Sequence, residues 1–183
     1  KHWVRVTAWN KLYRRELRES LRLPRGKLHE DEFIIHHILV RCNKAACVSE
    51  ALYLYLKRGG SITGSSFTLN RLDAAEALFD RAKVLLEHSM SSYSAYYACS
   101  VGLMVMTKGY LCLDIHDSHY RKRYKELCMN FRSAAAMLLR SDLALVWKIR
   151  LFFNRISPYY TWKYMERLMR KSGAGSPQEY TRA

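Results

Sequence analysis

The sequence predicts an all-α protein, an antiparallel bundle of six to seven helices. Apolar residues recur at helical spacing through almost the whole chain, and the alternation typical of strands is scarce. Apolar side chains make up 49% of the 183 residues, which is enough for a sizeable core in a chain of this length. Short connections between the expected helices favour antiparallel neighbours.

The first two expected helices form a basic N-terminal pair over residues 1–58. The first covers 7–23 and stops at Pro24, because proline cannot continue a helix. The second covers 30–57, opening on three acids and closing on a glycine pair. Residues 59–69 are rich in glycine and serine, which predicts a linker.

Residues 70–172 are expected to form the bundle core, and 173–183 a mobile tail. The first three helices of the expected bundle core reach about Leu86, Leu113 and Leu139, and two more helices follow them. Polar residues that favour N-caps mark the expected starts: Asn70, Ser91 or Ser92, Asp117 or Ser118, Ser141 and Asp142, and Ser157 ahead of Pro158.

The chain carries 31 basic and 16 acidic side chains, a formal charge of +15. The excess lies in residues 1–60 and 119–183, whereas 61–118 is close to neutral. A charge of this size does not report on the fold, but it favours association with polyanions such as nucleic acid or an anionic membrane.

The helix expected over 7–23 places six cations on one arc of about 100° on a helical wheel. Like charges on one face repel each other, so an anionic partner is favoured over a solvated face, which is the alternative. The six are Lys11, Arg14, Arg15, Arg18, Arg22 and Arg25.

Two later helices repeat this basic design. Cations in the first turns of the helix after Asp117 lie at the positive end of the helix dipole, where phosphates would compensate them. The alternative is that acids from elsewhere in the fold neutralise them. The predicted contacts are Arg121, Lys122, Arg123 and Lys125 in that helix, and Lys163, Arg167, Arg170 and Lys171 in the last one.

Known nucleotide, hydrolase and nucleic-acid-reading motifs are missing from the sequence. No catalytic residue, metal or cofactor is therefore predicted, and contact with the backbone of folded RNA is the economical hypothesis. Two groups were weighed as metal sites and not adopted, because their spacing fits zinc poorly or fits a helix cap with surface histidines better. They are His36, His37, Cys42 and Cys47, and Asp114, His116, Asp117 and His119.

Five cysteines without a CxxC pair indicate a reducing compartment, either the cytoplasm or the mitochondrial matrix. The most apolar stretch, 93–113, contains Lys108 and several serines. We expect it to be a buried core helix rather than a membrane span.

Residues 74–131 resemble HEPN domains, a helical family common in RNA-targeting toxins. The resemblance rests on the runs 74–78, 82–87 and 93–98. It continues at Gly109, His119 and Phe131. The family's ribonuclease motif is an arginine followed four to six residues later by histidine. Because no histidine follows His119, the resemblance implies a scaffold role without nuclease activity.

The sequence therefore favours a non-enzymatic, RNA-backbone-binding structural subunit of a ribonucleoprotein, such as a ribosomal or RNA-guided assembly. Apolar and aromatic residues such as Trp9 and Trp162 are expected to dock onto protein neighbours. The first alternative is a HEPN-like RNA-targeting domain. The second is a peripheral membrane-surface protein anchored by the helix over 7–23, although a membrane partner is not expected.

Overall fold

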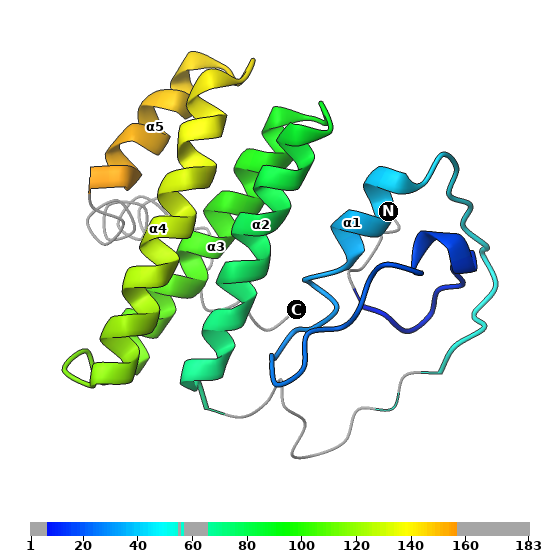
Figure 1. The fold of residues 1–183 in the computed structure, drawn as a ribbon, viewed down its shortest axis with the longest axis horizontal. Coiled ribbons are helices and arrows are strands. Elements are labelled where there is room, and N and C mark those ends of the chain that lie inside the picture. The colour runs from blue at the N-terminus through cyan, green and yellow to red at the C-terminus, as the bar shows by residue number, and fades with distance from the viewer. Residues whose placement is uncertain (1–6, 55, 57–65, 157–183) are drawn as a thin grey trace, which may run out of the picture.

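A computed structural model describes residues 7–54, 56 and 66–156 (Figure 1). Within these residues the secondary structure is entirely helical, which confirms the all-α class. The α-helices are α1 (Ile35–Arg41), α2 (Asp73–Glu87), α3 (Ser92–Cys112), α4 (Ser118–Arg140) and α5 (Leu145–Ile156). Two short 3-10 turns, η1 (Arg15–Leu17) and η3 (Leu69–Leu72), complete the elements.

Helices α2 to α5 lie side by side and run alternately up and down, whereas α1 packs on the opposite side of α2 (Figure 1). The core forms where α2 and α4 pack together and against α3. At its centre the rings of Phe79 and Phe131 lie 5.7 Å apart and are almost fully buried. Burying side chains of this size is the main favourable term in folding.

Two glycines of α3 let neighbouring elements approach closely. A Cβ atom on Gly102 would lie 2.6 Å from Cε1 of Phe79. One on Gly109 would lie 2.7 Å from Cδ2 of Leu72. Both distances are shorter than van der Waals contact, so a larger residue at either position would force Phe79 or Leu72 to shift.

The predicted starts of two bundle helices are confirmed by their caps. The hydroxyl oxygen of Ser91 accepts from the backbone N–H three residues on, at 3.3 Å, and begins α3. Oδ1 of Asp117 accepts from the backbone N–H of Tyr120, at 2.8 Å, and begins α4. Asn70 is not a cap: it lies within η3, and α2 begins after it.

Residues 7–54 and 56, here called the N-terminal arm, differ most from expectation. The helix expected over 7–23 is wrong, because η1 is the only helical turn in that range. Asn10 has a φ of 62° in the left-handed region, which interrupts a right-handed helix. The six cations therefore do not share one helix face.

The second expected helix, over 30–57, is reduced to the seven residues of α1. At Cys42 the backbone turns extended, with φ −91° and ψ 116°, and no helix follows in the arm. Leu52, Leu54 and Leu56 belong to the apolar run on which the prediction of a longer helix rested, and they are exposed instead of packed in a core.

No helix in the described part of the chain is both long enough and apolar enough to cross a bilayer. All five cysteines are unpaired, and Cys99 is buried in the core. The helix expected after Ser157 and the tail 173–183 lie outside the described residues.

Candidate functional site

A groove of about 580 Å³ follows the first half of α4, where the connection from α3 meets it. This volume lies in the range of small-ligand sites. Aromatic and basic side chains dominate its wall. The lining residues are Tyr110, Ile115, Tyr120, Arg121, Tyr124, Lys125, Cys128, Met129 and Arg132.

Three exposed cations border the groove. Two of them, Arg121 and Lys125, were predicted as phosphate contacts, and Arg132 was missed. The guanidinium of Arg121 donates to the carbonyl of Ile115 at 3.2 Å, so its stem is held beside the groove. Lys122, also predicted as a phosphate contact, is exposed but does not line the groove. Lys125 lies four residues after Arg121, and Arg132 lies seven residues after Lys125. This helical spacing would have identified Arg132 as the third cation of the same face.

Tyrosines form the aromatic wall of the groove, and one of them carries a hydroxyl group that, within the described part of the chain, is free to donate a hydrogen bond. Tyr120 is 4% exposed, and among the described residues its hydroxyl has no hydrogen-bond partner. Burial raises the pKa of Tyr120 and raises the pKa of Tyr124 to about 12, so both remain protonated. A buried hydroxyl without a partner is uncommon in proteins and offers a donor to a bound ligand.

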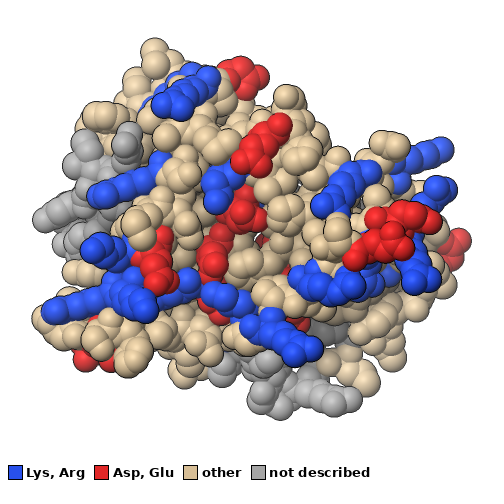
Figure 2. All heavy atoms as spheres, viewed as in Figure 1, with Lys and Arg blue, Asp and Glu red and all other residues tan. Residues whose placement is uncertain are grey.

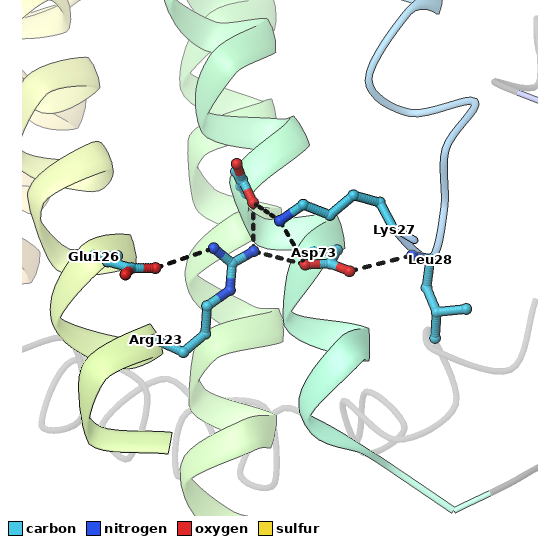
Figure 3. Close-up of polar contacts among 6 residues, drawn as sticks. Lys27, Leu28, Asp73, Arg123 and Glu126 are labelled. Atoms are coloured by element: carbon cyan, nitrogen blue, oxygen red, sulfur yellow. Dashed lines mark hydrogen bonds and ion pairs between the residues drawn. The ribbon is translucent and has the colours of Figure 1, made fainter. Parts of the chain in front are cut away.

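Arg123 differs from its basic neighbours because acids surround it (Figure 3). Its side chain is 16% exposed and donates to Asp73 Oδ1 at 2.7 Å, to Glu76, and to Glu126 at 3.4 Å. Lys27 of the N-terminal arm completes the cluster, with Nζ 3.2 Å from Asp73 Oδ1 and 2.8 Å from Glu76 Oε2. For Arg123 the structure thus supports neutralisation by acids from elsewhere in the fold.

This cluster remains charged at neutral pH. Burial alone would raise the pKa of Glu76, but hydrogen bonds from Lys27 and Arg123 outweigh it and hold that pKa below its ordinary value. Burial would lower the pKa of Lys27, and its bonds to Glu76 and Asp73 raise it further than burial lowers it. The backbone N–H of Leu28 also donates to Asp73, at 3.2 Å. The cluster therefore fastens the N-terminal arm to α2 and α4.

The predicted cations of the N-terminal arm are mostly exposed, but local contacts hold several of them. Arg15 lies 3.9 Å from Glu19, and Arg22 donates to the carbonyl of Glu19. Lys11 donates to the carbonyl of Thr7 at 2.7 Å. Arg14, Arg18 and Arg25 are exposed, as are Arg15 and Arg22.

On the face drawn in Figure 2, acidic side chains lie among the basic ones rather than apart from them. This face therefore carries charges of both signs. The four cations expected in the last helix, Lys163, Arg167, Arg170 and Lys171, lie outside the described residues.

Two adjacent histidines of α1 meet an aspartate of α2. His36 and His37 each direct Nε2 at Oδ2 of Asp80, at 2.9 and 3.2 Å. The hydrogen bond with His36 lowers the pKa of Asp80, and burial lowers the pKa of His36. Cys42 and Cys47, weighed with these histidines in the sequence, are not part of the cluster. Sequence reasoning missed Asp80 because it lies more than forty residues away.

The second histidine pair lies at the exposed start of α4. Asp114 accepts from the backbone N–H of His116 at 2.8 Å, and His119 Nδ1 lies 3.8 Å from Asp117. This arrangement is the helix cap with surface histidines that the sequence favoured.

Comparison with known proteins gives one match. Glycosyltransferase GlyA of Streptococcus pneumoniae serotype 4 is 35% identical to this chain over 63 residues. The matched stretch is 34% of this chain and 9% of GlyA, so the chain spans only a small part of that protein. No protein-family profile matches the chain, and no solved structure matches it.

Proposed function

We propose that this chain is a portion of a glycosyltransferase, an enzyme that moves a sugar from an activated donor to an acceptor hydroxyl. The observation that carries the proposal is the 35% identity to glycosyltransferase GlyA over 63 residues. The matched stretch is 9% of GlyA, so the donor, acceptor and partners are also part of the proposal. The non-enzymatic, RNA-binding role favoured by the sequence stays a proposal beside it, as the second candidate.

The N-terminal arm supports a role inside a larger enzyme. Its extended part carries large apolar side chains in solvent, and Leu54 is 84% exposed. Its neighbours Val48, Leu52 and Leu56 are 65–76% exposed. An exposed apolar stretch of this kind is typical of a segment that packs against another protein surface. Ion pairs to α2 hold the arm in place while this stretch stays uncovered.

Within this proposal we assign the role of base to Asp31. It lies just before α1 and lines a cavity of about 40 Å³ with Tyr13 and Arg18. That volume admits a hydroxyl group or a water but not a sugar ring. Inverting sugar transfer uses a base within hydrogen-bond reach of the acceptor hydroxyl. Oδ1 of Asp31 accepts from the backbone N–H of Glu32 at 3.0 Å, whereas Glu32, Asp73, Glu76 and Asp80 are held by cations or histidines.

The test is release of nucleoside diphosphate from a panel of UDP-sugars, with a divalent cation and simple sugar acceptors present. We expect turnover that falls by about 100-fold or more in Asp31→Asn, the loss typical of a missing general base. Asp142→Asn, an exposed acid between α4 and α5, is the matched control and should retain turnover. If saturation-transfer NMR detects no binding of any UDP-sugar, the proposal is wrong.

RNA binding is the second candidate, and the groove on α4 favours it. Cations beside aromatic rings suit phosphates and unpaired bases together. Three phosphate contacts predict a slope of about −2 when the logarithm of affinity for single-stranded RNA is plotted against the logarithm of salt concentration. Exchanging Arg121, Lys125 and Arg132 together for Gln should remove this slope, whereas Arg140→Gln, exposed at the far end of α4, should not. Duplex DNA serves as the competing polyanion.

The remaining sequence-based hypotheses have unequal support. The HEPN resemblance covers α2, α3 and the first part of α4, which pack together, and a relationship to that family stays a proposal. The membrane-surface hypothesis required a helix over 7–23, which the described structure does not contain. The helix expected after Ser157 would be the sixth α-helix of the chain, counting α1 to α5.

A further inference from the structure

Two imidazoles and one carboxylate converge where α1 packs on α2. Nε2 of His36 and Nε2 of His37 lie 2.9 and 3.2 Å from the same atom, Oδ2 of Asp80. One ligand atom from each residue lies within 4.8 Å of the other two. The three donors therefore face a common point without any rearrangement of the backbone.

A backbone carbonyl holds Nδ1 of His36, which directs Nε2 at Asp80. Its Nδ1 lies 3.1 Å from the backbone carbonyl of Glu32, which can only accept. In the neutral ring with its one N–H at Nδ1, Nε2 presents a lone pair to the carboxylate; in the protonated ring, Nε2–H donates to Asp80. In both cases a positive charge, either a proton or a metal ion, accounts for the 2.9 Å between Nε2 and Oδ2.

In metal-binding sites, the histidine nitrogen that does not bind the ion often donates to a backbone carbonyl, as Nδ1 of His36 can do here. This hydrogen bond fixes the tautomer and aims the other nitrogen at the ion. His36 is 1% exposed and is held rigidly. His37 and Asp80 are each about one third exposed, at 33% and 37%, so an ion and its water have access from solvent.

We infer that His36, His37 and Asp80 form a binding site for a divalent transition-metal ion. Two imidazole nitrogens and one carboxylate oxygen suit Zn²⁺ with a water in the fourth position. Lys83 Nζ lies 3.7 Å from Oδ1 of Asp80, which leaves Oδ2 facing the histidines. Because the ligands come from α1 and α2, a bound ion would clamp the N-terminal arm to the bundle. The inference is independent of the proposed glycosyl transfer.

The experiment is titration of the chelator-treated chain with Zn²⁺ by calorimetry, with Co²⁺ as a spectroscopic probe. We expect one ion per chain, a higher thermal midpoint with metal, and a Co²⁺ spectrum without a thiolate charge-transfer band. Asp80→Asn and His37→Gln should each weaken binding by about tenfold or more, as loss of metal-site contacts does. His37→Gln alters a partly exposed residue, so it tests the site even if Asp80→Asn fails to fold.

The control is the double exchange of His116 and His119 for Ala, which removes the exposed pair at the start of α4. This variant should bind Zn²⁺ as the parent does. Equal binding by His37→Gln, a thiolate band with Co²⁺, or no stoichiometric binding would overturn the inference. The last result would leave the cluster as a histidine–aspartate ion pair only.

Discussion

Replacing Arg123 by Gln should lower the free energy of unfolding by about 2–3 kcal/mol. Removing one partner of a buried ion pair typically costs about 3–5 kcal/mol, because the other partner keeps an uncompensated charge. Here the loss is smaller, since Lys27 still contacts Asp73 and Glu76, and the Arg123 side chain is 16% exposed. For a chain of this size the thermal midpoint should fall by about 5–10 °C.

Urea unfolding followed by circular dichroism at 222 nm measures this change. The slope with denaturant should stay constant, because the surface exposed on unfolding does not change. Arg121→Gln is the matched control: it alters an exposed arginine two residues earlier and should shift stability by no more than about 0.5 kcal/mol. A loss below about 0.5 kcal/mol in Arg123→Gln, or an equal loss in both variants, would refute the role assigned to the cluster.

Three more predictions follow from individual contacts. The folded pKa of Glu76 lies below its ordinary value of 4.5. Its contribution to stability is therefore present above pH 4.5 and is lost as the pH falls through the folded pKa. In urea unfolding measured at several acidic pH values, Arg123→Gln should make this loss of stability with falling pH smaller. Gly102→Ala should cost about 1–3 kcal/mol, measured by urea unfolding, because its Cβ would overlap the ring of Phe79. Tyr120→Phe should stabilise the chain by about 1 kcal/mol in the same assay, since it removes a buried hydroxyl without a partner, and a loss of stability would indicate a hidden partner.

The bundle helices were predictable because their information is local. A serine cap and an aspartate cap mark where α3 and α4 begin, and both starts were predicted correctly. The N-terminal arm was not predictable in this way. Its course depends on Lys27 and Arg81 reaching acids about fifty residues distant in the sequence, and on Asn10 in the left-handed region.

The residues of the candidate site were likewise predictable only in part. Arg121 and Lys125 were predicted from charge alone, and they do border one groove. Charge could not separate them from Arg123, because only the fold decides which cation meets an acid. Likewise the pairing of His36 and His37 with Asp80 joins two elements that no motif connects.

The sequence by itself therefore determined the helical class, the starts of α3 and α4 and the excess of basic charge, because helix signals act over a few residues. The tertiary structure alone decided which charges are buried and paired, which tyrosine hydroxyl lacks a partner, and which side chains converge on one point. Those properties depend on distances between residues far apart in the chain, and packing in the folded state determines these distances.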